Sequence, residues 1–187
     1  MSHDNLCFNG DHLKHKNYKY YHDNKWGKPV YDDQELFKNL SLEILQTGLK
    51  WSMILDKEEA ISVLLFNFNI EKLSQISDSY IDSLMKNRSI IRHRKKLEAV
   101  RTNAQIIDLI HKDNKKFSDI VWSFFNNKII DNKFTKFSEI PCQDNNSKKL
   151  SKFLKSLGLV FIGPKLCYSF MESCGIYNNH IVTCAMR

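Results

Sequence analysis

The chain has 187 residues, with 28 Lys and Arg against 21 Asp and Glu, and a pI near 9.1. An apolar fraction of 42% is too high for a disordered chain, and the positive balance favours a polyanionic partner, nucleic acid first. No apolar run reaches 18 residues, and the first five residues lack the apolar stretch of a signal peptide, so we expect neither a spanning helix nor a signal peptide. We therefore expect one cytoplasmic unit over residues 1–187, with no membrane partner. The five cysteines then predict thiols or metal ligands, not disulfides.

Apolar residues recur along the chain at steps of three and four, which is typical of amphipathic helices. Leu36, Leu40 and Ile44 form one such stripe, and Asp32 followed by Glu35 resembles a capping box at its start. No run alternates as a strand does. The pattern predicts an all-α fold with helices near 33–47, 57–66, 71–75, 78–86, 90–111, 117–125, 147–157 and 164–174, and a polar loop over 126–146.

Residues 147–175 predict a helix, a short hairpin and a second helix. Ser147 is placed to cap the first helix and Gly158 to end it, while Pro164 suits the first turn of the second helix. Gly163 at the mouth of that helix would let a phosphate approach backbone N–H groups, with Lys165 close by. The pattern fits a DNA-binding hairpin, but taken alone it fits an ordinary helical hairpin with solvated lysines better.

Two groups of residues are candidates for chemistry. Glu43 sits among leucines in a predicted helix, where burial raises a carboxyl pKa; the alternative is a helix-edge residue that reaches solvent or pairs with Lys. Residues 18–27 carry four aromatic side chains and one His, and aromatic faces stack on extruded bases. Their alternative is an aromatic subcore.

Cys7, His22, His180 and Cys184 are candidate metal ligands. His180 and Cys184 are four residues apart, so a helical turn would place them on one face. Two Cys and two His suit a closed, tetrahedral structural zinc site. Isolated Cys and His residues usually have other roles, so the spacing alone leaves this assignment open.

Several segments together resemble the DNA-3-methyladenine glycosylase I family of the helix-hairpin-helix glycosylases. The match follows the family order over nearly the whole chain, which a single motif would not establish. The motifs are YHDNKWG at 21–27, LEILQTGLKW at 42–51, IIRHR at 90–94, WSF at 122–124, FIGP at 161–164 with CYSFM at 167–171, and NHIVTC at 179–184.

This resemblance implies a monomeric, all-α enzyme that acts on double-stranded DNA with alkylated bases. Such an enzyme flips 3-methyladenine out of the duplex and hydrolyses its N-glycosidic bond, leaving an abasic site. By the same resemblance Glu43 contacts the methylated base. With DNA as the partner, the hairpin pattern makes Gly163 and Lys165 the expected DNA contacts, although Lys165 stands where the family usually has Thr. The implied base-binding residues are Tyr18, Tyr21, Trp26 and Trp51. The implied ligands of a structural Zn²⁺ are Cys7, His22, His180 and Cys184, which would join the two ends of the chain.

The chain departs from the family pattern at several positions. Ser89 stands where a Gly is usual, Lys50 precedes Trp51, and the segment Phe8 to Gly10 lacks an expected Trp. Residues 177–179 offer no carboxylate where many relatives in the superfamily carry an Asp. Two alternatives follow, a catalytically weak lesion- or DNA-binding protein that keeps the fold, and a zinc-stabilised module that binds only protein.

Overall fold

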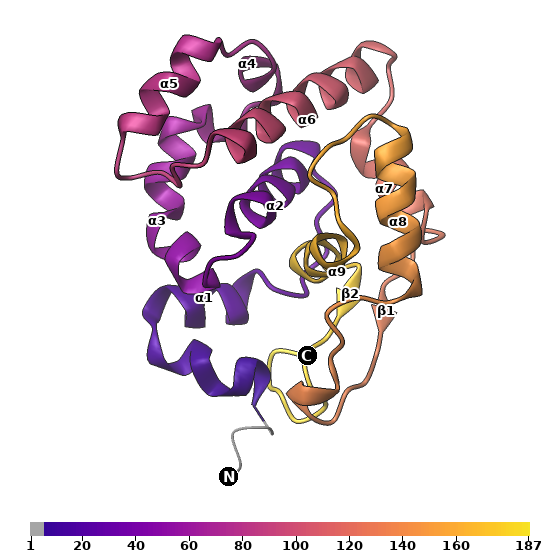
Figure 1. Cartoon of the computed structure of the whole chain (residues 1–187). Coiled ribbons are helices and arrows are strands. Elements are labelled where there is room, and N and C mark those ends of the chain that lie inside the picture. The colour runs from indigo at the N-terminus through magenta and orange to yellow at the C-terminus, as the bar shows by residue number, and fades with distance from the viewer. Residues whose placement is uncertain (1–5) are drawn as a thin grey trace.

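The computed structural model describes residues 6–187, so residues 1–5, considered above for a signal peptide, lie outside the described part of the chain. Nearly all of the regular structure is helical, as predicted (Figure 1). The helices are α1 (Lys16–Asn24), α2 (Asp33–Gln46), α3 (Trp51–Leu64), α4 (Ile70–Ser74), α5 (Asp78–Lys86), α6 (Arg94–Lys112), α7 (Phe117–Ser123), α8 (Asn145–Ser156) and α9 (Pro164–Ser173). Short 3-10 segments are η2 (Cys7–Lys14), η3 (Phe66–Phe68) and η4 (Phe137–Glu139).

Helix α2 lies in the middle of the fold and is surrounded by other helices (Figure 1). It contacts α3, α6, α7 and α9. Asp32 caps its first turn by accepting a hydrogen bond from the Glu35 N–H, as the sequence predicts. All residues from Ser41 to Leu45 are buried, so the second half of α2 faces protein around its whole circumference. A polar side chain on this stretch is therefore buried.

The main differences from the predicted elements lie at helix beginnings. Helix α1 was not predicted, because its apolar atoms belong to tyrosines amid Lys and Asn and form no aliphatic stripe. Helix α3 begins at Trp51 rather than 57, directly after a turn in which Gly48 has φ +80°. Helix α6 begins at Arg94 rather than 90, because the His93 ring caps it by accepting from the Lys96 N–H.

Helices α8 and α9 pack against each other and are joined by residues 157–163. Asp144, not Ser147, is the N-cap of α8; Ser147 is the third helical residue and completes the capping box by bonding back to the Asp144 N–H. Gly158 follows the end of α8 with φ +98°, and Pro164 is the first residue of α9, both as predicted.

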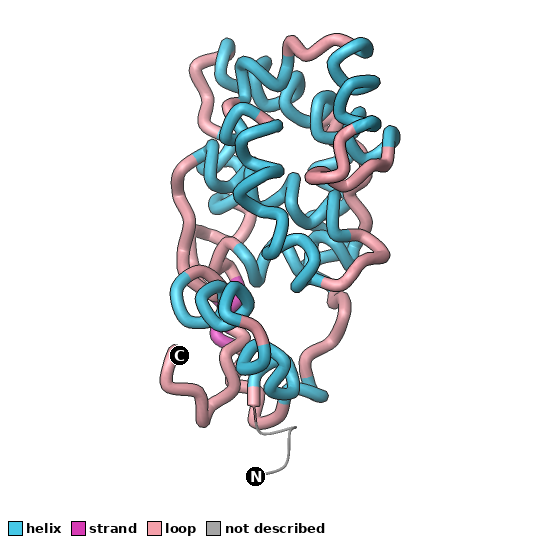
Figure 2. Tube along the Cα trace, turned by 90° about the vertical axis from the view of Figure 1, so that its left-hand side faces the viewer, coloured by secondary structure: helices cyan, strands magenta, loops and turns pink. Residues whose placement is uncertain are grey.

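The polar connection between α7 and α8 is tied to the C-terminal segment. Strands β1 (Ile130–Asp131) and β2 (Tyr177–Asn178) form a two-residue parallel ladder that the sequence did not predict. The C-terminal segment and η2 meet at the same end of the molecule, at the bottom of Figures 1 and 2. Among residues 6–187, no helix is long and apolar enough to cross a membrane.

Candidate functional site

A pocket of about 130 Å³ opens where α1, α2 and α9 approach one another. This volume is well below the roughly 300–1,000 Å³ of pockets that hold drug-sized ligands, so it suits one small group. The lining residues are Phe8, Tyr18, Tyr21, Trp26, Glu43, Gln46, Trp51, Ser169 and Glu172. The pocket thus brings together all the residues that the sequence nominated for base contact, and four that it did not.

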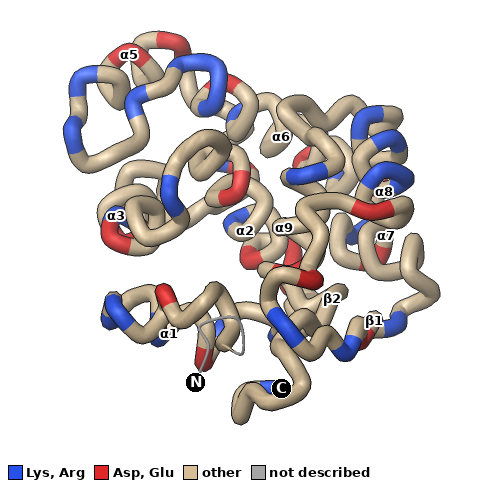
Figure 3. Tube along the Cα trace, turned by 60° about the horizontal axis from the view of Figure 1, so that its bottom comes forward, with Lys and Arg blue, Asp and Glu red and all other residues tan. Residues whose placement is uncertain are grey.

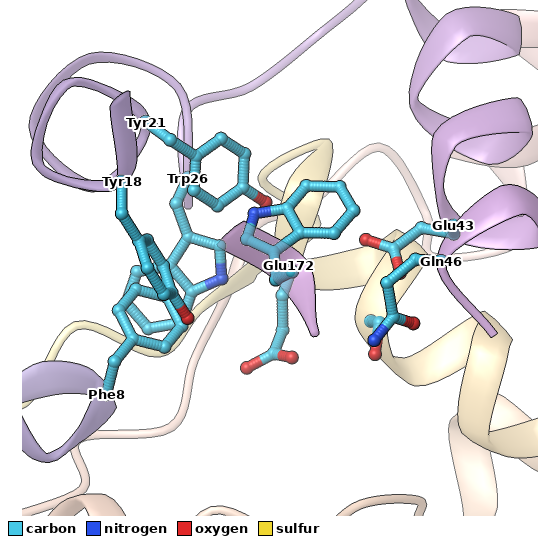
Figure 4. A pocket seen from close by; sticks show the side chains of 9 residues that line it. Phe8, Tyr18, Tyr21, Trp26, Glu43, Gln46 and Glu172 are labelled. Carbon is cyan, nitrogen blue, oxygen red and sulfur yellow. The ribbon is translucent and has the colours of Figure 1, made fainter. Parts of the chain in front are cut away.

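Aromatic rings form one wall of the pocket (Figure 4). The Phe8 ring lies 4.5 Å from that of Trp26 and 4.9 Å from that of Tyr18, and Tyr21 lies 5.1 Å from Trp51. Phe8 therefore supplies an aromatic face from the segment in which a Trp was missing. Tyr21 and Trp26 also belong to a buried cluster, so the aromatic residues are both a subcore and a pocket wall.

Carboxyl groups face this aromatic wall (Figure 4). Glu43 is only 5% exposed, which excludes the alternative of a solvent-exposed helix edge, and its carboxyl has no hydrogen-bond partner among the described residues. Glu172, on α9, accepts a hydrogen bond of 2.8 Å from the Asn179 amide. The buried indole N–H of Trp51 is also without a partner in the described part of the chain. These groups are available to a ligand.

Burial controls the protonation of both acids. It raises the pKa of Glu43 from 4.5 to about 8, and the charge of nearby Glu172 adds to the rise. Burial also raises the pKa of Glu172 to about 8, while the hydrogen bond from Asn179 acts in the opposite direction. Both carboxyls are therefore mainly neutral at pH 7 when the pocket is empty, and a cation that enters would favour their ionised forms.

The end of α2 is held in place by a buried lysine from α6. The Lys96 ammonium donates hydrogen bonds of 2.7 Å to the Leu45 carbonyl and 2.6 Å to the Thr47 carbonyl. These bonds satisfy carbonyls at the C-terminal end of the helix that carries Glu43 and Gln46. Lys50, which departs from the family pattern beside Trp51, is exposed and is not among the residues that line the pocket, so its charge lies outside the lining.

A second cluster lies beside the aromatic wall. The donor atoms of Cys7, His22, His180 and Cys184 all lie within 4.8 Å of one another. The Cys184 thiol is 3.4 Å from His180 Nδ1 and 3.5 Å from His22 Nε2. A tetrahedral zinc ion with bonds of about 2.0–2.3 Å separates its ligands by about 3.6 Å, so the four atoms fit such an ion.

Both imidazoles in this cluster are oriented by a second oxygen acceptor. His180 Nε2 lies 3.1 Å from the Trp26 carbonyl, and His22 Nδ1 lies 2.6 Å from the Asp23 carboxylate. Each ring therefore keeps a proton on the outer nitrogen and turns a lone pair toward the thiols, as metal-bound histidines do. His180 and Cys184 meet through a turn and not through the helical turn considered from their spacing.

The hairpin between α8 and α9 presents Gly163 as the N-cap of α9, with Lys165 exposed in its first turn. A side chain added at Gly163 would meet no atom within 4 Å, so the space beside its backbone is open. Asn103 on α6 fixes the hairpin from behind, because its side chain donates to the Val160 carbonyl and accepts from the Val160 N–H. Helix α8, which leads into the hairpin, carries several Lys residues (Figure 3).

Sequence reasoning missed Phe8, Gln46, Ser169 and Glu172. Gln46 follows Glu43 by three residues, so helical spacing alone would have placed it on the same face. Glu172 and Ser169 share a face of α9 in the same way, but no sequence pattern shows that this face meets α2. The place of Ser169 and Glu172 in the pocket depends on the packing of α9 against α2, which lies more than 100 residues earlier in the chain.

The fold and the pocket define a helical protein with a small pocket that is lined by aromatic rings and two carboxyls. The model of the methyladenine glycosylase family matches residues 12–187. DNA-3-methyladenine glycosylase of Haemophilus influenzae is 41% identical over 167 residues, which are 89% of this chain and 90% of that protein. The chain belongs to the methyladenine glycosylase family.

Solved structures agree with this assignment. The structure of 3-methyladenine DNA glycosylase I from Staphylococcus aureus is 36% identical, with a TM-score of 0.92 over 100% of this chain and 97% of that one. A tyrosine-to-phenylalanine variant of 3-methyladenine DNA glycosylase I, solved in complex with 3-methyladenine, is 39% identical, with a TM-score of 0.89 over 92% of this chain and 93% of that one.

Proposed function

We propose that this protein removes 3-methyladenine from alkylated double-stranded DNA by hydrolysing its N-glycosidic bond, which leaves an abasic site. The observation that carries the proposal is the small aromatic pocket, which is also lined by the buried carboxyl of Glu43, a group without a hydrogen-bond partner among the described residues. A relative of the same fold was solved with 3-methyladenine bound. The lesion must leave the base stack to enter such a pocket, at a cost of a few kcal/mol that is smaller for a damaged pair.

The pocket suits the charge of the lesion. A 3-methyladenine nucleotide is cationic, so the faces of Tyr18, Trp26 and Trp51 attract it through cation–π interactions. An ionised Glu43 adds a charge-assisted hydrogen bond that neutral adenine cannot match. The positive charge also weakens the bond to deoxyribose. Residues 177–179 supply no carboxylate of their own, since they are Tyr and two Asn. Asn179 is instead fully buried and hydrogen-bonded to Glu172.

The hairpin supports the proposed partner. The open N-terminal end of α9 at Gly163 and the exposed Lys165 suit a phosphate of the DNA backbone. We infer a single folding unit, because Trp51 and Ile140 pack against both buried clusters and join them. A monomeric state belongs to the same proposal, as the family resemblance implies. A cytoplasmic location is part of the same proposal, since a repair enzyme needs access to the genome.

Cys7, His22, His180 and Cys184 would hold one zinc ion in the proposed protein. Four protein ligands leave no open position, so the ion would contribute folding free energy and take no part in the hydrolysis. The oriented imidazoles support this role. The ion would join η2 and α1 to the C-terminal segment beside Trp26, which lines the pocket.

The proposal is tested by release of free base from methylated duplex DNA, resolved by chromatography. We expect wild-type protein to release 3-methyladenine and leave 7-methylguanine in place, and we expect Glu43→Gln to lower this release at least about 10-fold, as the loss of a charged contact does. A folded wild-type protein that binds methylated DNA but releases no base would overturn the proposal. It would favour the alternative of a lesion-binding protein that keeps the fold without the activity.

A further inference from the structure

The pocket is acidic, although the protein as a whole is basic. Its lining holds two carboxyls and, among the described residues, no Lys, Arg or His, in a chain of net charge +7. Figure 3 shows Asp and Glu on α2 and α9 in the middle of the molecule, while α8 carries several Lys residues. The sequence singled out Glu43 alone, and the second acid has no assigned role.

Glu172 is held so that it faces the pocket. One of its oxygens accepts the 2.8 Å hydrogen bond from Asn179. Asn179 is fully buried and fixed in turn by Tyr168, 3.0 Å from its amide nitrogen, and by Asn132, 2.8 Å from its amide oxygen. Because the Glu172 carboxyl accepts no other hydrogen bond among the described residues, its second oxygen is available to a ligand. Figure 4 shows this carboxyl between the aromatic wall and the side chains of Glu43 and Gln46.

We propose that Glu172 is a second specificity-determining residue, which together with Glu43 makes the pocket selective for bases that carry a positive charge. The inference rests on the proposed function and adds to it. Two carboxyls on different helices can contact one cationic ring at two positions, whereas a neutral base leaves both without a counter-charge. Selection by charge then complements selection by shape, which discriminates poorly between adenine and a base with one more methyl group.

Binding of a cationic base would then release protons. The groups that face Glu172 are Tyr18 and Tyr21 on α1, Glu43 on α2, and Tyr168 on α9. Burial raises the pKa of all three tyrosines above the ordinary value, so they stay neutral and the carboxyls are the groups that titrate. The half-saturating concentration for a cationic lesion should therefore fall as pH rises from 6 to 8.

The test compares a cationic lesion with a neutral one of the same shape. Single-turnover excision from duplex DNA that carries 3-methyladenine gives a half-saturating enzyme concentration and a maximal rate. Direct binding to duplex DNA with 3-deaza-3-methyladenine, its neutral isostere, gives a dissociation constant. The variants are Glu172→Gln, which keeps an oxygen for Asn179, and Glu71→Gln, an exposed residue of α4 that changes the net charge equally.

At pH 8 we expect Glu172→Gln to raise the half-saturating concentration for 3-methyladenine about 10-fold, with a smaller rise at pH 6, the size expected when one charged contact is lost. Affinity for the neutral isostere and all values of Glu71→Gln should stay within about twofold. Equal weakening for both lesions would show that Glu172 only supports the fold, and would overturn the inference.

A second comparison keeps the inference testable if Glu172→Gln is poorly folded. The single variant Glu43→Gln should still prefer the cationic lesion over the isostere in direct binding, because Glu172 remains in the pocket. A Glu43→Gln variant without any such preference would overturn the role of Glu172. If the wild type released no 3-methyladenine, the proposed function itself would fail, which is a different outcome from wild-type release with unchanged selectivity.

Discussion

At the scale of single residues, burial is what makes Glu43 useful. The carboxyl lies in the part of α2 that is surrounded by protein, so its charged form is disfavoured until a ligand brings a counter-charge. Without a ligand, a buried carboxyl such as that of Glu43 lowers the free energy of unfolding at high pH, where it must ionise. In the proposed function the same property would favour a cation over a neutral base, which would link stability to selectivity at this position.

The linkage predicts a pH-dependent effect of Glu43→Gln on stability. The pKa of Glu43 is about 8 in the folded chain against 4.5 as the ordinary value, so the folded state holds a proton that the unfolded state has released. Its stabilising effect is complete below about pH 4.5 and is lost as pH rises through 8. The free energy of unfolding of Glu43→Gln, relative to wild type, should therefore increase by several kcal/mol between pH 4.5 and 8, at about 1.4 kcal/mol per pKa unit.

Denaturant unfolding of both proteins at pH 5 and pH 8.5 measures this difference. Glu98→Gln is a suitable control, because it removes a half-exposed carboxyl of α6 far outside the pocket lining. A stability difference between Glu43→Gln and wild type that stays constant with pH would contradict the assigned pKa and, with it, the buried state of the carboxyl.

At the scale of elements, α6 supports both the pocket and the hairpin. Lys96 and Asn103 are seven residues apart, which is two turns, so they share one face of the helix. Lys96 binds the end of α2, and Asn103 binds the hairpin backbone at Val160. One helix thus sets the distance between the aromatic pocket, where we propose that the flipped base binds, and the proposed contact with the DNA backbone.

We expect Asn103→Leu to affect the hairpin more than the pocket. The substitution removes both hydrogen bonds to Val160, which should cost about 1–3 kcal/mol of stability. It should also weaken binding to undamaged duplex DNA several-fold and leave the excision rate at saturating enzyme within about twofold. Gln105→Leu is the control, since it removes a hydrogen bond of the same helix to Ser74, away from the hairpin. If both variants lost duplex affinity equally, the hairpin role of Asn103 would be wrong.

At the scale of the whole molecule, the Cys–His cluster joins segments from opposite ends of the sequence. Cys7 and His22 come from η2 and α1, and His180 and Cys184 come from the last ten residues. The large core of α2 to α9 does not include these four residues. A metal in the cluster should therefore stabilise the joined ends more than the core, because structural zinc contributes folding free energy locally.

Elemental analysis of protein purified without added metal should find about one zinc per chain. Cys184→Ser should lose most of this zinc, lower the melting temperature, and speed hydrogen exchange in residues 7–24 more than in α6, since α6 belongs to the main core. Cys142→Ser is the matched control, because Cys142 is exposed and lies outside the cluster. A Cys184→Ser variant with full zinc content and unchanged stability would refute this ligand set.

The helical character of the fold could be predicted from the sequence, because the apolar residues recur at helical spacing. The cap at Asp32 and the start of α9 at Pro164 could be predicted too, because they depend on neighbouring residues alone. Together with the family resemblance, the sequence also nominated Glu43 and four of the five aromatic residues that line the pocket, all but Phe8. The order of the motifs over the whole chain indicated the family and its site residues. Each motif taken alone also had a purely structural explanation.

The other residues of the site, apart from Gln46, could not be predicted, because they join it through packing between distant segments. Helix α1 carries no aliphatic stripe in its sequence, and it packs against α3 and η2. His180 and Cys184 come together through a turn, whereas their spacing suggests a helical turn. Glu172 faces Glu43 because α9 packs against α2, although the two residues are separated by most of the chain. Local spacing fixes which side chains share a helix face, but the packing of distant helices decides what that face meets.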